Sequence, residues 1–514
     1  MPRRFALALA LPLLAAWLPA AAQLPEPVAA ALRTTTIPED ALSVLVLRGD
    51  RTVLSHLADR PLQPASTMKL VTTLIGLERL GPVFRGRTEL RTDGEQRGDV
   101  LQGDLYLRGG ADMDLSTDTL TTMLRSLRNQ GIRTIAGRLV VDRQLFNPAR
   151  GDLGQPPFDE YPDAYYNVIP DALLVNKNMV QLDMRTTDGS GRVKVRMQPE
   201  LAGVKAASDM KLVDADCARW EDGWKTPEAI PQADGGIQLT LHGTFPKRCA
   251  AAYAVNVLDR QEYVDRLLRL TWKQLGGRIA GATVEAVTPP TTRLLAEHVS
   301  RTLPELVRDT NKPSDNALAR TIFLSLGALE PDPLLGSRPQ AGSAETTFSR
   351  ADAAIRGWMR GHGIDDTGLV LENGSGLSRT ERISPVQMAG VLQAGLRSNW
   401  SPEFLASMPI VAVDGTMRRR LHDSPAAGRA RMKTGTLNNV VALAGYVPDA
   451  QGRQCVLVAM VNSNLAGNGR GRAVLDALVD WVARLDETGT AGGAAPVPMP
   501  APAPTPTPTP TPQQ

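Results

Sequence analysis

The hydrophobic pattern near the start of the chain predicts two strands followed by a helix. Residues 41–47 and 52–57 are apolar-rich segments separated by a short polar turn. Apolar side chains then recur at helical spacing from Met68 to Leu77, and a Gly-Pro pair at residues 81–82 ends the pattern. We therefore expect a helix that begins near residues 64–66 and ends at about residue 81.

The middle of the chain has a different pattern of hydrophobic and polar residues. From about residue 88 to residue 250, short alternating segments are separated by Gly, Pro and Asp turns, which predicts a mostly β region. The strand candidates are residues 104–108, 137–142, 179–183, 193–197 and 237–241. Helical periodicity returns at residues 262–275 and again around residues 303–326.

The hydrophobic pattern near the C-terminal end predicts two apolar strands, at residues 440–447 and 455–461, and a helix over residues 472–485. The apolar stripe of that helix consists of Val474, Leu475, Leu478, Val479 and Val482. A membrane-surface face is one reading of such a stripe, but its position beside two apolar strands favours packing in a core. The tail, residues 488–514, is rich in Pro and Thr and is expected to be disordered or partly polyproline II.

The first 22 residues are typical of a secretory signal. Arg3 and Arg4 precede an apolar run that ends before the small residues Ala20 to Ala22, where we expect cleavage. A retained membrane anchor is the alternative, but the run is short and Pro19 follows it closely. No later segment offers about 18 uninterrupted apolar residues. We therefore expect an exported, periplasmic protein without a transmembrane span in the mature chain.

Charge and histidine placement argue against two function classes. With 57 basic and 54 acidic residues, and no basic block interleaved with aromatics, nucleic acid is not an expected partner. The five histidines lie far apart in the sequence without the spacing of metal ligands, so no metal is expected. These are His56, His242, His298, His362 and His422.

Three cysteines are too few to form the main scaffold. Cys217 and Cys249 both lie in a polar, loop-rich stretch, whereas Cys455 lies in an apolar run. Because an exported protein can form disulfides, we pair the first two and predict that Cys455 is a buried thiol. Three free thiols are the alternative.

The strongest chemical signal is a serine one helical turn before a lysine. Ser66 and Lys69 open the predicted apolar helix, so both side chains lie on one face and the amine can reach the hydroxyl. A serine needs a neighbour that takes its proton, and a lysine can do so only if burial and a second cation lower its pKa. Ser208 and Lys211 have the same spacing without a helical stripe, so we interpret them as a solvated turn.

A second motif, from Lys433 to Thr436, could supply that cation. Lys433 and Thr434 are suited to contact a substrate carboxylate, and Gly435 would let the backbone approach closely. The backbone N–H groups of Thr436 and Ser66 could together hold an oxyanion. A surface turn is the simpler alternative for Lys-Thr-Gly alone.

The third motif contains Ser314 and Asn316, separated by one aspartate. The hydroxyl and the amide could relay a proton to a leaving group and hold a substrate backbone. Taken alone, this segment is typical of a helix N-cap. Ser375 lies between two glycines, but the full Gly-x-Ser-x-Gly elbow is absent, so a glycine loop is favoured there. All three motifs in this order favour a serine acyl-transfer enzyme.

In these motifs the chain resembles the penicillin-recognising serine enzymes, and among them the low-molecular-mass class C penicillin-binding proteins, the D-alanyl-D-alanine carboxypeptidase/endopeptidase family. Further similar stretches occur at residues 311–316, 374–379, 414–418 and 445–447. About 250 residues lie between Ser66 and Ser314, which matches a family with domains inserted after the nucleophile helix.

The resemblance implies an α/β (α+β) transpeptidase/β-lactamase-like domain with an antiparallel sheet and helices. This domain would comprise residues 23–87 and 290–487, with residues 88–289 inserted as a mostly β region of two nested domains. It also implies a serine D,D-carboxypeptidase or D,D-endopeptidase that acts on peptidoglycan peptides through a Ser66 acyl-enzyme. β-Lactams would be covalent inhibitors, and no cofactor is implied.

The resemblance further implies a pocket for the side chain of the third residue of the substrate peptide. Arg379 and Asn438 would line it, and its acidic residue would be Glu160 or Asp163. One departure is Arg320, which stands where a glutamate is usual in the family.

Two alternatives remain at this level. A β-lactamase is disfavoured by the long insert and by the lack of a Glu-x-x-Leu-Asn segment after Ser314. A non-catalytic peptidoglycan-binding protein is disfavoured by the intact motif residues.

Overall fold

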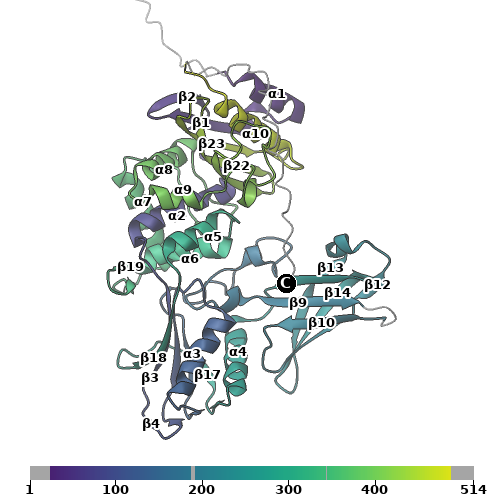
Figure 1. Cartoon of the computed structure of the whole chain (residues 1–514), viewed down its shortest axis with the longest axis vertical. Helices are drawn as coiled ribbons and strands as arrows, with labels where there is room; N and C mark the ends of the chain where they lie inside the picture. The colour runs from purple at the N-terminus through teal and green to yellow at the C-terminus, as the bar shows by residue number, and fades with distance from the viewer. Residues whose placement is uncertain (1–22, 187–190, 343, 488–514) are drawn as a thin grey trace, which may run out of the picture.

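The computed structural model describes residues 23–186, 191–342 and 344–487. The predicted signal peptide, residues 1–22, and the predicted disordered tail, residues 488–514, lie outside the described residues. Figure 1 shows an elongated molecule with an α/β part at one end and two further lobes at the other.

The α/β part is built on a five-stranded antiparallel sheet in which the two ends of the described chain meet. Its strands follow the order β2-β1-β23-β22-β21, so β1 pairs with β23 and β21 forms an edge. The bounds are β1 (Leu42–Arg48), β2 (Arg51–His56), β21 (Arg431–Leu437), β22 (Val440–Pro448) and β23 (Gln454–Asn462). The strands and turns predicted from the hydrophobic pattern lie at these positions.

Helices cover both faces of this sheet. On one face, α1 (Glu26–Thr35) packs with α10 (Arg470–Ala483), and the apolar stripe of α10 is fully buried there. The core interpretation of that stripe is therefore confirmed. The other face is covered by the remaining helices of this part, which are α2 (Met68–Leu80), α5 (Leu303–Asn311), α6 (Asn316–Ala328), α7 (Thr347–Gly361), α8 (Pro385–Arg397) and α9 (Ser401–Ser407).

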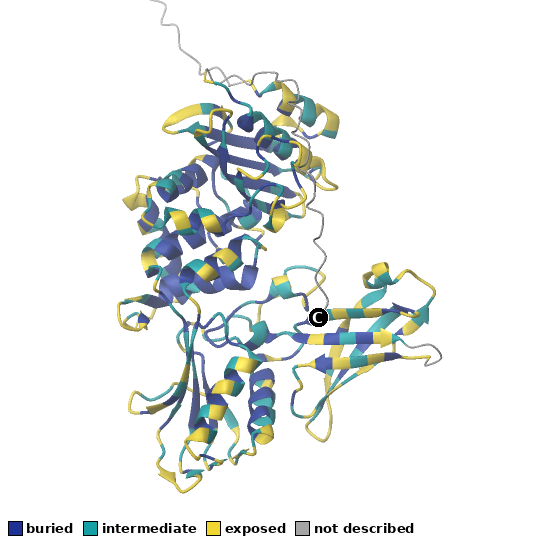
Figure 2. Ribbon diagram, viewed as in Figure 1, coloured by how far each residue is buried: buried dark blue, intermediate teal, exposed yellow. Residues whose placement is uncertain are grey.

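Helix α2 lies inside this helical layer, and its residues from Met68 to Leu77 are all buried (Figure 2). The helix packs closely against α6, because a Cβ on Gly76 would lie 2.8 Å from the Ile322 side chain. A helix that is buried on every side belongs to a core rather than to a surface. The consequence is that Lys69, in the first turn of α2, is held inside the protein.

The first lobe of the insert is a five-stranded sheet covered by two helices. Its strand order is β17-β8-β6-β3-β18, and it contains both parallel and antiparallel pairs. The bounds are β3 (Arg87–Thr92), β6 (Leu105–Gly110), β8 (Leu139–Asp142), β17 (Thr283–Glu285) and β18 (Arg293–Val299). Four short strands form a small neighbouring sheet, namely β4 (Gln96–Arg97), β5 (Val100–Leu101), β7 (Thr134–Ile135) and β16 (Arg278–Ile279). Because β18 pairs with β3, we propose that the insert extends to about residue 299.

The helices of this lobe are α3 (Thr117–Asn129) and α4 (Arg260–Gln274). The prediction of a mostly β stretch up to residue 250 missed α3. A capping box at Ser116 and Thr119 begins this helix, and its buried residues are Leu120, Met123, Leu124 and Leu127. That spacing is helical and was available in the sequence, but the surrounding short strands obscured it.

The second lobe consists of β-strands and one 3-10 helix, Cys217–Gly223. One sheet contains β9 (Val180–Thr186), β10 (Val193–Gln198) and β15 (Ala250–Val255), and the other contains β11 (Val204–Ser208), β12 (Lys211–Val213), β13 (Trp224–Pro231) and β14 (Ile237–Pro246). A disulfide joins Cys217 to Cys249 in this lobe, whereas Cys455 is a buried free thiol in β23. The cysteine pairing in the structure is thus the one expected from the sequence.

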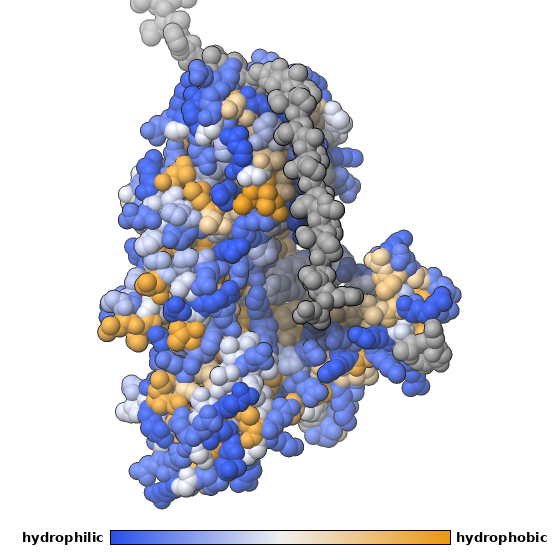
Figure 3. All heavy atoms as spheres, viewed as in Figure 1, coloured by the Kyte–Doolittle hydropathy of each residue, from blue (hydrophilic) through white to orange (hydrophobic). Residues whose placement is uncertain are grey.

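The surface offers little continuous apolar area on the face drawn in Figure 3, where hydrophobic side chains occur in separate groups among hydrophilic ones. One exposed pair, Leu334 and Leu335, lies in the hairpin between β19 (Leu329–Asp332) and β20 (Gly336–Pro339). Within the part of the chain that the structure describes, no helix has the length and apolar character needed to cross a membrane.

Candidate active site

Ser66 and Lys69 are brought together at the start of α2. Ser66 lies in a short 3-10 turn, Ala65–Thr67, which leads directly into the helix. Lys69 is one turn further along and fully buried, and its Nζ donates a hydrogen bond to Ser66 Oγ over 3.1 Å. Ser66 itself is only partly buried, so its hydroxyl can meet a substrate.

Lys69 has two further partners from distant parts of the chain. Its Nζ donates to Asn316 Oδ1 and to the Ser375 carbonyl, both over 2.6 Å. Burial lowers the pKa of Lys69 well below its usual value, and the nearby cation Lys433 lowers it further. A lysine in this environment can lose its proton and accept another from Ser66.

Lys433 lies in β21 with its ammonium group beside Ser314. Its Nζ donates to Ser314 Oγ and to the Thr434 carbonyl, both over 2.8 Å. Burial lowers the pKa of Lys433 to about 7. The Thr434 hydroxyl donates to Thr416 Oγ1 over 2.8 Å, so a row of donors follows this edge of the sheet.

Two glycines let other segments approach the nucleophile turn. A Cβ on Gly435 would lie 2.7 Å from the Pro64 carbonyl and 3.0 Å from Ser66 N, and a Cβ on Gly376 would lie 1.8 Å from the Ala65 carbonyl. Gly376 also has a φ of +81°, which disfavours any other residue. The edge strand β21 therefore packs on this turn at Gly435, and Thr436 is the next residue of the strand.

Glu381 holds the glycine loop in place and had not been singled out from the sequence. Its Oε1 accepts hydrogen bonds from the backbone N–H groups of Glu372, Asn373 and Gly374, over 3.2, 3.0 and 2.8 Å. Burial raises the pKa of this carboxyl group. The loop is thereby fixed so that the carbonyl of Ser375 points at Lys69. No motif singles out Glu381 in the sequence, because a glutamate seven residues after a glycine matches no known sequence pattern.

The insert also reaches the site through its 3-10 turn Tyr165–Asn167. The Asn316 amide donates to the Tyr166 carbonyl over 2.9 Å, and the Tyr165 hydroxyl donates to Asp315 Oδ2. Arg320, which departs from the family pattern, is buried on α6 and donates to the Val168 carbonyl over 2.9 Å. These contacts had no counterpart in the sequence motifs, because they join segments about 150 residues apart.

The residues of the implied side-chain pocket come from separate segments of the chain. The Arg379 guanidinium lies 4.6 Å from the centre of the Phe158 ring and borders a cavity of about 570 Å³. Asn438 is exposed in the turn between β21 and β22. Asp163 is buried and accepts from Thr226 Oγ1, whereas Glu160 is exposed. Of the two acidic candidates, only Glu160 is therefore open to solvent.

Ser208 and Lys211, the pair with the same spacing as Ser66 and Lys69, end β11 and begin β12. Ser208 Oγ accepts from the backbone N–H of Met210, and Lys211 is exposed. No helix places the lysine over the serine here, and the segment lies in the β lobe. The predicted solvated turn corresponds in the structure to the short connection between these two strands.

A partly exposed serine beside a buried lysine, with a second lysine and a serine opposite, defines a serine acyl-transfer site in an α/β domain. The chain belongs to the D-Ala-D-Ala carboxypeptidase 3 (S13) family, whose family model matches residues 25–485. The resemblance found in the sequence is thereby confirmed. The protein is a serine peptidase of the D-Ala-D-Ala carboxypeptidase type.

Two D-alanyl-D-alanine carboxypeptidases align with most of the chain. The D-alanyl-D-alanine carboxypeptidase DacB of Haemophilus influenzae is 26% identical over 411 residues, which are 79% of this chain and 81% of that protein. The D-alanyl-D-alanine carboxypeptidase of Actinomadura sp. strain R39 is 28% identical over 417 residues, 79% of this chain and 74% of that protein.

The crystal structure of penicillin binding protein 4 from Haemophilus influenzae has a similar fold. It matches with a TM-score of 0.70 at 22% identity and covers 88% of this chain and 97% of that one. The predicted transpeptidase/β-lactamase-like fold is therefore confirmed.

Proposed function

We propose that the protein cleaves the D-Ala-D-Ala bond of peptidoglycan stem peptides and the D-centred bond of their cross-links, with Ser66 as the nucleophile. The observation that carries this proposal is the hydrogen bond between Lys69 Nζ and Ser66 Oγ at a site where burial lowers the pKa of the lysine. The relatives named D-alanyl-D-alanine carboxypeptidase support the substrate class.

In the first step, neutral Lys69 takes the proton of Ser66 while Oγ attacks the carbonyl carbon of the scissile bond. The backbone N–H groups of Ser66 and Thr436 hold the oxyanion. The leaving amine receives its proton through Ser314, whose hydroxyl is bonded to Lys433. The proton that Lys69 took from Ser66 replaces the one delivered through Ser314, so Lys69 is neutral again in the acyl-enzyme. Water then attacks the acyl carbon while Lys69 takes a proton from that water, and Lys69 returns this proton to Ser66 Oγ as the ester bond breaks.

The carboxylate of the terminal D-Ala is bound at the edge strand in this proposal. The ammonium group of Lys433 and the hydroxyl of Thr434 provide donors there, and Gly435 allows β21 to lie close to the nucleophile turn at Ser66. A β-lactam carries a strained amide beside a carboxylate, so the same groups would accept it and Ser66 would be acylated. No cofactor takes part.

The side chain of the third residue of the stem peptide is proposed to contact Arg379 and Asn438. Arg379 is exposed at the border of the cavity and is supported from one side by Phe158. The exposed Glu160 is the better acidic candidate, since Asp163 is turned toward Thr226 inside the insert. We further propose that the first 22 residues direct export of the protein to the periplasm. The peptidoglycan substrate occurs in that compartment.

A digest of purified cell-wall sacculi tests the proposed function. We expect release of free D-Ala from stem peptides and a loss of cross-linked dimers, both suppressed by prior treatment with penicillin. Sacculi left unchanged, together with rapid turnover of penicillin, would replace the proposal with a β-lactamase. Sacculi that bind the protein without any released product would indicate a binding protein.

A further inference from the structure

The insert contributes a lysine to the centre of the Ser314–Asn316 motif. Lys177 Nζ lies 2.8 Å from Asp315 Oδ2 and 2.5 Å from the Tyr165 hydroxyl, which donates to the same carboxylate oxygen. Lys177 and Tyr165 both belong to the insert, whereas Asp315 is the residue between Ser314 and Asn316. The ion pair is partly shielded from solvent, since the Asp315 side chain is 7% exposed and the Lys177 side chain is 35% exposed.

Asp315 links the insert to the catalytic lysine through the first turn of α6. Its Oδ1 accepts from the backbone N–H of Leu318 over 2.9 Å and so caps α6, while its Oδ2 takes the two donors from the insert. Asn316 is the first residue of that helix, and its Oδ1 accepts from Lys69 Nζ over 2.6 Å. A shift of Asp315 would therefore move the acceptor that Lys69 uses.

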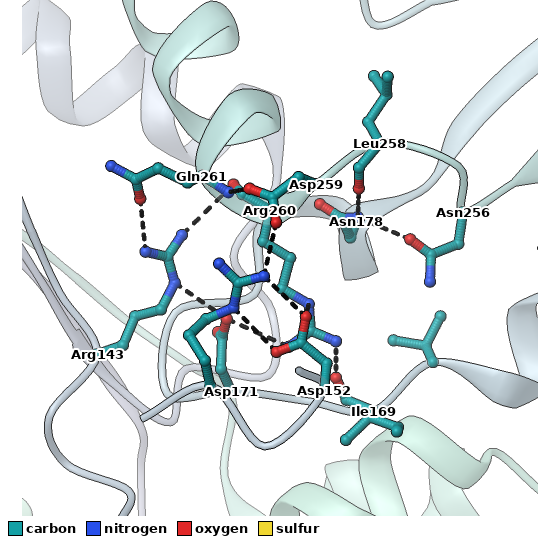
Figure 4. A network of polar contacts seen from close by, with 12 residues as sticks. Arg143, Asp152, Ile169, Asp171, Asn178, Asn256, Leu258, Asp259, Arg260 and Gln261 are labelled. Atoms are coloured by element: carbon teal, nitrogen blue, oxygen red, sulfur yellow. Dashed lines mark hydrogen bonds and ion pairs between the residues drawn. The ribbon is translucent and has the colours of Figure 1, made fainter. Parts of the chain in front are cut away.

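The backbone around Lys177 is held in an unusual conformation. Asn176, Lys177 and Asn178 have φ values of +46°, +56° and +57°, a left-handed run that non-glycine residues rarely adopt. Both flanking amides are fixed, because Asn176 donates to the Tyr263 hydroxyl over 3.0 Å and Asn178 donates to the Leu258 carbonyl over 2.8 Å (Figure 4). Strained backbone that the surroundings maintain in this way is concentrated at functional sites.

A buried ionic network supports the same segment from the insert side (Figure 4). Asp171 accepts from Arg143 Nε over 3.0 Å and from Arg260 Nη1 over 3.3 Å, and all three side chains are buried. Arg260 also donates to the Ile169 carbonyl. The chain between Tyr165 and Lys177 is thus attached to the first lobe of the insert at its middle as well as at its end.

We propose that Lys177 is a positioning residue of the catalytic site, whose ammonium group pairs with Asp315 and keeps the Ser314–Asn316 turn aligned with Lys69. The insert then serves as part of the catalytic machinery through this residue. The inference rests on the proposed acylation of Ser66.

The charges around Lys69 predict the direction in which the pKa of Lys69 changes when the charge of Lys177 is removed. Lys433 and Arg320 lower the pKa of Lys69, whereas Asp315 and Glu381 raise it. In the wild type, the carboxylate of Asp315 forms an ion pair with the ammonium group of Lys177. Removing the positive charge of the insert leaves the aspartate unbalanced, so that the pKa of Lys69 rises and less of the amine is neutral at a given pH.

Other charged groups near Lys177 are already paired. A small cavity beside it is also lined by Asp112 and Asp171. Asp112 accepts from His298 Nδ1 over 2.6 Å, and Asp171 is held by Arg143. Neither carboxylate replaces Asp315 as the partner of Lys177.

The test compares Lys177→Met with Lys177→Arg and with Lys194→Met, a change at an exposed lysine of the same insert. The rate of Ser66 acylation by penicillin is measured from about pH 5 to 9 on the full chain, together with the melting temperature. For Lys177→Met we expect the acid midpoint of the rate profile to move upward. A shift of about one pH unit would lower the rate about tenfold below the midpoint. Lys177→Arg should largely restore the profile, and Lys194→Met should match the wild type.

The double variant Lys177→Met with Asp315→Asn should return the midpoint toward that of the wild type, because the unbalanced charge is gone. An unchanged midpoint in Lys177→Met, with or without a lower melting temperature, would overturn the inference and leave the proposed function intact. A wild-type protein that is not acylated at Ser66 would instead refute the proposed function, and the inference with it.

Discussion

Lys433 Nζ donates a hydrogen bond to Ser314 Oγ over 2.8 Å, although 119 residues separate the two in the chain. The bond joins the edge strand of the central sheet to the turn before α6. It places a cation beside a hydroxyl in the same site as Lys69. A proton released from Ser66 to Lys69 can therefore be matched by a proton delivered from Ser314 on the other side of the reacting bond.

Removing the nucleophile should abolish both covalent labelling and hydrolysis. We expect Ser66→Ala to show no mass increase with penicillin and no release of D-Ala, whereas changing Ser208 and Lys211 together should have little effect. Intact-mass spectrometry followed by peptide mapping measures the adduct. A penicillin adduct on any residue other than Ser66 would refute the mechanism.

Acylation of Ser66 should depend on the chemical nature of the base, Lys69, and on pH. Lys69→Arg should lower acylation by at least about 1000-fold, since a guanidinium group keeps its proton. In the wild type, acylation should fall as the medium becomes more acidic. The pKa values of Lys69 and Lys433 are both lowered, and below them the pair gains its second proton and the base is lost. Acylation rates that stay flat into acid would contradict a lysine base.

Burial of Lys433 should make stability depend on pH. Its pKa is lowered from 10.5 to about 7 on folding, so the unfolded chain binds more protons between these values and stability rises with pH across that window. Relative to Lys433→Met, the free energy of unfolding of the wild type should increase by roughly 4 kcal/mol between about pH 7 and 10. Urea denaturation of both proteins at each pH measures the difference. Parallel pH profiles for the two proteins would show that burial does not lower the pKa of Lys433.

Arg379 should affect substrate choice more than catalysis. We expect Arg379→Ala to lower kcat/KM by about 10- to 100-fold on stem peptides that carry a free carboxylate on the third side chain, because a charge-assisted hydrogen bond is lost. A minimal acyl-D-Ala-D-Ala peptide should be cleaved as before. Arg397→Ala, at an exposed position on α8, is the control. Equal loss on both substrates would indicate a structural role for the arginine.

The disulfide should stabilise the β lobe. Cys217 and Cys249 are 32 residues apart, and closing a loop of that length contributes about 3 to 4 kcal/mol. Replacing both by serine should lower the midpoint of unfolding for this lobe, as followed by Trp fluorescence. Alkylation of the wild type in denaturant without reductant should label Cys455 alone. Labelling of Cys217 or Cys249 under those conditions would contradict the bond.

The sequence by itself determined the order of the main elements and the identity of the three motifs. The spacing of Ser66 and Lys69 on an apolar helix needs only local geometry, because one turn of helix brings such side chains together. The strands around Val44 and Val458 could be recognised for the same reason, since alternation and apolar runs report local environment. The pairing of Cys217 with Cys249 followed from composition, because only these two cysteines share a polar stretch.

Only the tertiary structure decided which distant groups meet at the site. Glu381 binds three backbone N–H groups, and backbone contacts leave no residue pattern that a single sequence can show. Lys177 meets Asp315 across 138 residues, through a backbone whose left-handed conformation comes from its surroundings rather than from its own preference. Local propensity acts over a few residues, whereas burial and charge pairing are set by packing between segments. For this reason the motifs could be identified from the sequence, while the groups that tune them required the fold.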